Sequence, residues 1–153
     1  MKSEPDNKMN AKNDEMVLPG DILVVDDEVP NLQLLTQLLS EAGYQVRPAS
    51  SPQWALKSAL AKPPNLILLD VKMPEMDGFE LCRRLKSNAA TEDIPVIFLS
   101  ALRDTKDKVR GLQLGALDYV SKPFQPEEVI ARVDTHLTIH RLRREVQNQR
   151  DQL

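Results

Sequence analysis

Five short apolar runs occur along this chain of 153 residues, and each is followed by a segment whose apolar residues recur at helical spacing. The clearest run is Leu66–Asp70, four aliphatic residues that end on a carboxylate, with Pro63-Pro64 just before it. A continuous aliphatic run of this length is typical of a strand buried on both faces of a parallel sheet. Because strands that alternate with helices form parallel sheets covered on both faces, the pattern predicts an α/β fold.

The topology can be narrowed further, because crossovers between parallel strands are right-handed and leave few arrangements. We predict a flavodoxin-like, doubly wound, five-stranded parallel sheet with strand order 2-1-3-4-5 and five helices, of which the last is extended. The expected strands are 21–26, 44–49, 65–70, 94–100 and 117–121. The expected helices are 30–42, 52–62, 78–87, 104–114 and one that begins at 126.

Composition excludes several classes of protein. The net charge of −3 gives no general electrostatic reason to bind nucleic acid, so we expect no nucleic-acid partner for this chain. The single cysteine, Cys82, allows no internal disulfide. No apolar run reaches the roughly 20 residues that a membrane helix needs, and the amino terminus lacks the apolar core of a signal peptide. We therefore expect a cytoplasmic protein without a membrane contact.

Chemically active side chains stand at the carboxyl ends of the predicted strands. They are Asp26 and Asp27 after the first strand, Asp70 after the third, Ser100 after the fourth and Lys122 after the fifth. In open α/β sheets the site lies at these strand ends, so the five groups are expected to converge. Two carboxylates about 4 Å apart repel by roughly 4 kcal/mol at an effective dielectric constant near 20. A hard divalent cation would relieve that repulsion, and Mg²⁺ fits an all-oxygen site best.

A carboxylate in such a site can act as a nucleophile toward phosphorus. Asp70 is ionised at neutral pH and needs no general base. Phosphoryl transfer depends mainly on positioning and on neutralising charge, which Mg²⁺ and Lys122 would supply while Ser100 donates a hydrogen bond. An Asp after a strand can also be plain turn chemistry, but the groups at the other strand ends favour a functional site over that alternative.

The motifs in this order resemble the response-regulator receiver domain of two-component signalling, over about residues 21–137. Each motif alone is weak, and their order at strand ends is specific. They are Asp26-Asp27; Leu69-Asp70 with Met73-Pro74 and Asp77-Gly78; Ser100-Ala101; and Gly115-Ala116 leading to Asp118-Tyr119-Val120-Ser121-Lys122-Pro123-Phe124.

The resemblance implies that Asp70 is the phosphoacceptor. It implies that Asp26, Asp27 and Asp70 hold Mg²⁺, with Asp27 a direct ligand and the backbone carbonyl of Lys72 a further one. Lys122 would pair with the phosphoryl oxygens.

The resemblance also implies a switch. Ser100 would turn toward the phosphoryl group, and Tyr119 would follow from an exposed to a buried rotamer. Ala101 is small and would leave room for the phosphodonor. The peptide bond between Lys122 and Pro123 is expected to be cis. Output would leave through the face formed by helix four, strand five and helix five.

The implied function is a phosphorylated signalling switch, not an enzyme beyond assisting its own phosphorylation and dephosphorylation. Its partner would be a histidine kinase or a histidine phosphotransfer protein. One alternative is a receiver excised from a larger regulator or hybrid kinase. A second is a Mg²⁺-dependent phosphatase of the haloacid-dehalogenase type, but that type has Asp-x-Asp after strand one and a cap domain, whereas Asp26 and Asp27 are adjacent. A third, the pseudo-receiver, usually lacks an acidic residue or the lysine.

The expected domain organisation is a disordered polar tail at 1–18, a receiver domain at 19–138 and a helical extension at 139–153. The extension carries a heptad seam whose spacing favours a short parallel coiled coil, and hence a homodimer, or a linker to an output domain that this chain lacks. The seam consists of Ile139, Leu142, Val146, Gln149 and Leu153. Four arginines nearby are interpreted as a solvated face. His136 and His140 show no zinc motif.

Overall fold

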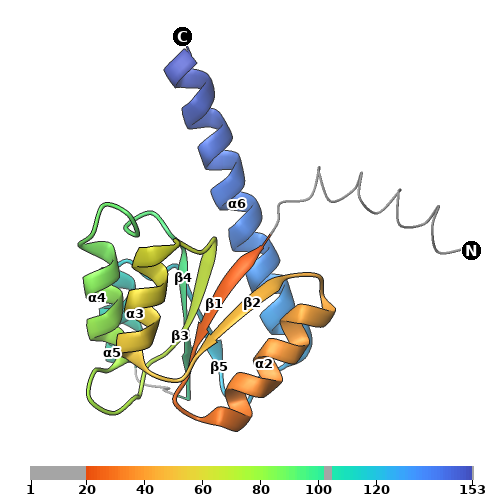
Figure 1. Ribbon diagram of the computed structural model, residues 1–153, viewed down its shortest axis with the longest axis vertical. Helices are drawn as coiled ribbons and strands as arrows, with labels where there is room; N and C mark the ends of the chain where they lie inside the picture. The colour runs from red at the N-terminus through yellow and green to blue at the C-terminus, as the bar shows by residue number, and fades with distance from the viewer. Residues whose placement is uncertain (1–19, 102–104, 153) are drawn as a thin grey trace, which may run out of the picture.

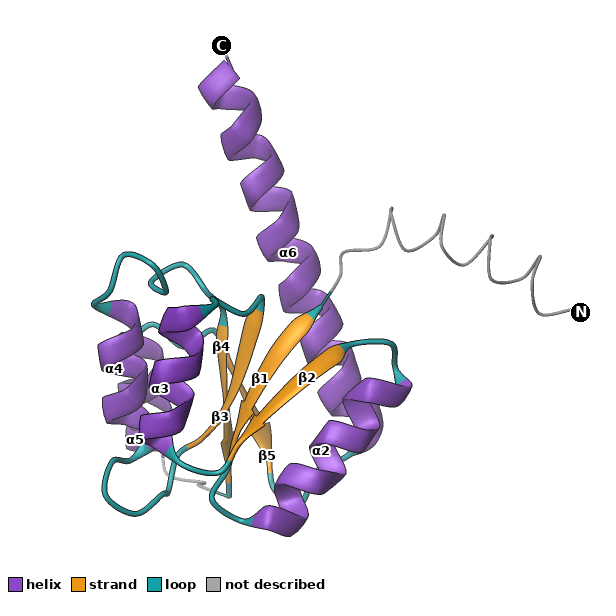
Figure 2. Ribbon diagram, viewed as in Figure 1, coloured by secondary structure: helices purple, strands orange, loops and turns teal. Residues whose placement is uncertain are grey.

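The structure is a computed structural model that describes residues 20–101 and 105–152. The predicted tail at 1–18 therefore lies outside the described residues. A central sheet is covered by α3, α4 and α5 on one face and by α2 and α6 on the other (Figures 1 and 2). The strands are β1 (Asp21–Val25), β2 (Gln45–Ala49), β3 (Leu66–Asp70), β4 (Val96–Ser100) and β5 (Asp118–Ser121). The helices are α2 (Val29–Glu41), α3 (Pro52–Ala61), α4 (Gly78–Lys86), α5 (Thr105–Gln113) and α6 (Pro126–Gln152).

The sheet has the order β2-β1-β3-β4-β5, and all four pairings are parallel. The predicted fold class and strand order are thus confirmed. β1, β3 and β4 occupy the centre, and β3 and β4 are buried along their whole length. This burial on both faces explains why these strands are apolar without alternation.

Side chains of the central strands point alternately into two apolar layers. Ile67, Leu69 and Phe98 lie in the layer beneath α3 and α4, whereas Leu68 and Ile97 lie in the layer beneath α2 and α6. All five are completely buried. The period of two along a strand therefore divides one aliphatic run between the two layers.

Local signals set the ends of the helices. The Ser51 side chain accepts a hydrogen bond from the backbone N–H of Trp54 at 3.1 Å and caps α3, whose first residue is Pro52. Asp77 caps α4 in the same way by accepting from the backbone N–H of Glu80 at 2.9 Å. After α2, Gly43 takes a φ of 103°, a left-handed conformation that glycine adopts without strain.

The last helix, α6, extends well beyond the part of it that packs on the sheet. Val129, Val133 and Leu137 of α6 are buried against the sheet, and every described residue after Arg141 is exposed. Figure 1 shows α6 running past the sheet and protruding beyond it. Among the described residues, no helix combines the length and the apolar character that a membrane span requires.

Candidate functional site

The carboxyl ends of the strands meet at one edge of the sheet and form a cleft of about 330 Å³. Strand register places the ends together: Ser100 pairs with Ser121, and the backbone N–H of Lys122 donates to the Ser100 carbonyl at 3.0 Å. The cleft is lined by Asp27, Glu28, Asp70, Val71, Lys72, Ser100, Ala101 and Lys122.

Three carboxylates form the acidic part of the site. Asp26, Asp27 and Asp70 each offer an oxygen, and these oxygens lie within 4.8 Å of one another. Asp26 is 0% exposed and Asp70 is 3% exposed, while Asp27 is half-buried. The cluster is therefore an arrangement of largely desolvated negative charge, which is costly unless a cation or a proton offsets it.

Within the described part of the chain, Lys122 is the positively charged residue that contacts these carboxylates. Its Nζ lies 3.1 Å from Asp70 Oδ1, 3.5 Å from Asp26 Oδ2 and 3.8 Å from Glu28 Oε1. One ammonium group is thus shared among three carboxylates. The net charge of the site stays negative with Lys122 fully ionised.

The charge imbalance shifts the pKa values of the central pair. Burial, followed by the charge of Asp26, raises the pKa of Asp70 from 3.8 to about 6, although the hydrogen bond from Lys122 opposes the shift. Burial alone would lower the pKa of Lys122, but its hydrogen bond to Asp70 and the surrounding carboxylates outweigh that effect and raise it. Lys122 therefore remains a cation throughout the physiological range.

One oxygen of Asp26 indicates that the site can accept a metal ion. Asp26 Oδ1 accepts from the backbone N–H of Glu28 at 2.9 Å. The other oxygen, Oδ2, is buried and has no hydrogen-bond partner among the described residues, only the ion-pair contact with Lys122. A buried carboxylate oxygen with unused acceptor capacity, beside two further carboxylates, fits a hard divalent cation with oxygen ligands.

The remaining predicted site residues fall into two groups. Ser100 is 4% exposed and lines the cleft, as do the exposed residues Lys72 and Ala101. Tyr119 does not line the cleft: its hydroxyl donates to the backbone carbonyl of Lys108 at 3.0 Å, and its ring packs on Phe98 with centroids 5.6 Å apart. The peptide bond between Lys122 and Pro123 is cis.

Two features of this region were not predicted from the sequence. Gly78 is the first residue of α4, and a Cβ atom there would lie 2.2 Å from the Asp70 carbonyl oxygen at the end of β3. Glu28 reaches Lys122 from the start of α2. The Asp77-Gly78 pair was visible as a motif, but its close approach to Asp70 depends on how α4 packs.

A third feature connects β5 to α6. Asp118 Oδ2 contacts Arg132 Nη1 at 2.6 Å and His136 Nε2 at 3.0 Å. Burial acts to raise the pKa of Asp118, but these two contacts and the Tyr119 backbone N–H lower it overall. His136 is thus paired with a carboxylate on the neighbouring strand, a contact between residues 18 apart that no local pattern signals.

A doubly wound parallel sheet with three carboxylates, a hydroxyl group and a lysine at its strand ends defines the class of CheY-like receiver proteins. The chain belongs to the response regulator receiver domain family, whose model matches residues 22–134. The prediction of a two-component receiver domain is thereby confirmed.

Individual relatives agree with this assignment. The chain is 47% identical over 112 residues to the alkaline phosphatase synthesis transcriptional regulatory protein PhoP of Bacillus subtilis, covering 73% of this chain and 46% of that protein. It is 39% identical over 147 residues to a probable cyclic di-GMP phosphodiesterase of Vibrio cholerae, covering 96% of this chain and 33% of that protein. The chain spans about half the length, or less, of the curated relatives it matches.

Solved structures show the same fold. The chemotaxis protein CheY4 of Vibrio cholerae superimposes with a TM-score of 0.74 at 29% identity, covering 77% of this chain and 98% of that one. A CheY-like receiver domain protein of Methanospirillum hungatei gives a TM-score of 0.77 at 26% identity, covering 82% and 99%.

Proposed function

We propose that this chain is a phosphoacceptor switch in which Asp70 receives a phosphoryl group from a histidine kinase or a histidine phosphotransfer protein. One observation carries the proposal: Asp70 is a desolvated carboxylate that lines the cleft, with the Lys122 ammonium group 3.1 Å from its Oδ1. Membership of the receiver family supports it, because that family serves two-component signalling. A histidine-kinase partner also implies a cytoplasmic location, which we propose.

The transfer forms a bond between an Asp70 carboxylate oxygen and phosphorus and breaks the phosphorus–nitrogen bond of the donor's phosphohistidine. The imidazole leaves and takes up a proton, and later hydrolysis of the acyl phosphate restores the carboxylate. In this mechanism Lys122 neutralises charge on the phosphoryl oxygens, and Ser100 donates a hydrogen bond to them. Asp70 must be ionised to react, and with a pKa of about 6 it is largely ionised at neutral pH.

Mg²⁺ is the proposed cofactor. Asp26, Asp27 and Asp70 would hold it together with the backbone carbonyl of Lys72. When bound, Mg²⁺ offsets the negative charge of the carboxylates and of the phosphoryl group. The unused acceptor capacity of Asp26 Oδ2 supports this assignment.

The switch is proposed to pass from Ser100 to Tyr119. The two residues lie on neighbouring strands, β4 and β5, and the Tyr119 ring packs on Phe98 of β4. Movement of Ser100 toward a phosphoryl group would free space for Tyr119, whose hydroxyl group would leave the Lys108 carbonyl. The face made by α5, β5 and α6 would thereby be repacked.

Burial distinguishes this proposal from a phosphatase of the haloacid-dehalogenase type, in which the carboxylate after strand one would be the nucleophile. Of the two carboxylates after β1, Asp26 is 0% exposed and does not line the cleft, and Asp27 lines it without a contact to Lys122 among the described residues. Asp70 both lines the cleft and lies 3.1 Å from Lys122 Nζ. We therefore propose that the chain is no enzyme in its own right. Its proposed organisation remains a tail at 1–18, a receiver domain at 19–138 and a helical extension at 139–153.

Phosphorylation from a small donor tests the proposal. Incubation with acetyl phosphate and Mg²⁺ is expected to add one phosphoryl group to the intact mass of the wild-type chain, and Asp70→Asn should abolish the addition. Asp93→Asn, an exposed carboxylate outside the cleft, serves as the matched control and should be modified like the wild type. A wild-type chain that stays unmodified, or an Asp70→Asn variant that is still modified, would contradict the proposal.

A further inference from the structure

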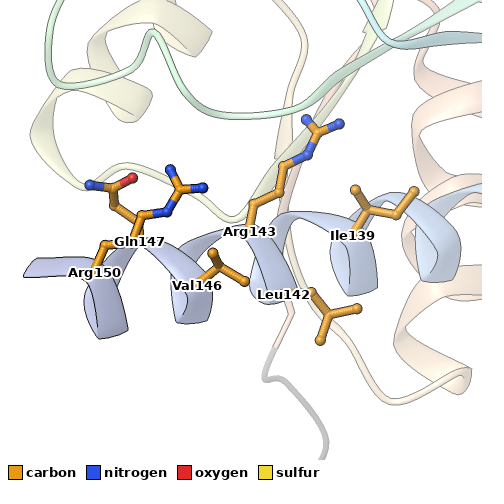
Figure 3. Close-up of a pocket in the computed structure, with 6 residues that line it drawn as sticks. All are labelled: Ile139, Leu142, Arg143, Val146, Gln147 and Arg150. Atoms are coloured by element: carbon orange, nitrogen blue, oxygen red, sulfur yellow. The ribbon is translucent and has the colours of Figure 1, made fainter.

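Beyond Leu137, α6 presents an apolar face that the described part of the chain does not cover. Ile139, Leu142 and Val146 are 37%, 48% and 50% exposed. They line a shallow groove along the helix together with Arg143, Gln147 and Arg150. In Figure 3, Leu142 and Val146 project from the same side of α6.

This face points away from the body of the molecule. At 100° per residue, the centre of the exposed stripe lies roughly 150° around the helix from the buried stripe of Val129, Val133 and Leu137. The side that continues the buried stripe instead carries His140, Arg144 and Gln147, which line a separate cleft against the loops before β3 and β4. The receiver body therefore cannot cover the apolar face without unwinding or bending α6.

The residue types of the stripe match one kind of coiled coil. Spacings of three and four residues place Ile139 and Val146 at heptad position a, and Leu142 and Gln149 at position d. β-Branched residues at a with leucine at d favour two parallel strands over three or four. The next a position, Leu153, lies outside the described residues.

The flanking charges favour the same arrangement. In this register Glu145 occupies position g and Arg150 the following position e, and both are exposed. In a parallel, in-register pair, g of one helix faces the next e of the other, so Glu145 meets Arg150 of the second copy. An antiparallel pair would bring Arg143 and Arg150 of opposite copies together, which is repulsive.

Helix formation does not limit this segment, although two heptads are short. An isolated helix of about 15 residues is marginal because nucleation is costly. Here α6 is one continuous helix from Pro126 to Gln152, and its first turns are fixed by burial against the sheet. The extension only has to propagate an existing helix.

From these observations we infer that the apolar face of the α6 extension is a homodimer interface, formed with the same face of a second copy as a parallel, in-register, two-stranded coiled coil. The inference does not depend on the proposed phosphoryl chemistry, since α6 runs away from the strand-end cleft (Figure 1). The 147-residue match to the Vibrio cholerae protein covers 96% of this chain, so it necessarily includes most of the extension.

Sedimentation equilibrium of the full chain between micromolar and millimolar concentration tests the interface. The average mass of the wild type is expected to rise toward twice the 17.3 kDa of one chain. Val146→Asp should hold the mass at that of one chain over the same range, while Asn148→Asp, at an outer heptad position, should associate like the wild type. Far-ultraviolet circular dichroism of each variant checks that the receiver remains folded.

Disulfide trapping tests the orientation. Under mild oxidation, Gln149→Cys should form a disulfide-linked dimer because parallel pairing places position d opposite itself, whereas Asn148→Cys should not. The wild type controls for Cys82, which is fully buried. Glu145→Lys should weaken association, and adding Arg150→Glu should restore it. A wild type that stays monomeric, or association that survives Val146→Asp, would overturn the interface; trapping at 148 but not at 149 would overturn the register.

Discussion

At the scale of single residues, the ionised Asp70 carboxylate lowers the stability of the folded chain when no divalent cation is bound. The pKa of Asp70 is about 6, above its ordinary value of 3.8, so the folded chain holds this proton more tightly than the unfolded chain does. The contribution of Asp70 to stability is therefore fully present below about pH 4 and is lost as the pH rises through about 6. A shift of roughly two units corresponds to about 3 kcal/mol of unfavourable free energy at neutral pH.

Asp70→Asn should consequently stabilise the metal-free protein at neutral pH, by about 1–3 kcal/mol once the lost attraction to Lys122 is allowed for. Near pH 4 the gain should largely vanish, since Asp70 is then protonated in the folded state and about half protonated in the unfolded state. Urea denaturation of both proteins at the two pH values, without divalent cations, measures the difference. Asp93→Asn controls for loss of an exposed charge; an Asp70→Asn variant that is less stable at neutral pH would contradict this account.

At the scale of elements, the contact between α5 and β5 depends on the absence of a side chain at Gly111. A Cβ atom there would lie 2.2 Å from the Tyr119 hydroxyl oxygen and 2.8 Å from the Phe98 ring. Glycine inside a helix ordinarily costs about 1 kcal/mol relative to alanine, so its presence at Gly111 is explained by this close approach.

Gly111→Ala should therefore lower the free energy of unfolding by about 1–3 kcal/mol, because overpacking outweighs the gain in helix propensity. Tyr119 should also be displaced, and its hydrogen bond to the Lys108 carbonyl should be lost. Urea denaturation and the chemical shifts of the Tyr119 ring measure the two effects. Gln113→Ala, at an exposed position of the same helix, should change neither; a Gly111→Ala protein as stable as the wild type would show that α5 moves freely.

The helices and strands differ in how well the sequence predicts them. The five strands followed from apolar runs, because such runs report burial directly, and their order followed from the right-handed crossovers between parallel strands. The prediction also placed Asp26, Asp70, Ser100 and Lys122 at one edge, because strand ends in a parallel sheet share an edge. Element ends were less accurate: β4 begins at Val96 and not at 94, after a proline that has no N–H to donate.

Contacts that depend on how helices pack on the sheet could not be predicted from the sequence. The approach of Gly78 to the Asp70 carbonyl and the pairing of Asp118 with Arg132 and His136 each depend on how a helix lies on the sheet. Neither has a local pattern, because the partners come from different elements. The spacing of His136 and His140 gives no sign of this contact, because the partner of His136 lies on β5.

At the scale of the whole molecule, the receiver and the α6 extension differ in how far their residues are buried. The buried stripe of α6 ends at Leu137, and no described residue after Arg141 is even half-buried. Truncation after Arg141 should therefore leave the unfolding free energy of the dilute protein within about 0.5 kcal/mol of the wild type, since surface changes rarely exceed that value. Urea denaturation at a concentration below that of self-association measures it.

Leu137→Ala, which alters a buried residue of α6, is the control for the truncation. Leu137 is 3% exposed in the layer with Ile97 and Val120, so removing most of its side chain should cost about 2–4 kcal/mol. The truncated chain should lose concentration-dependent association yet retain phosphorylation, whereas Leu137→Ala should weaken the receiver itself. If truncation destabilised the dilute chain as much as Leu137→Ala does, the extension would have to pack on the receiver, and its apolar face would not be available to a second copy.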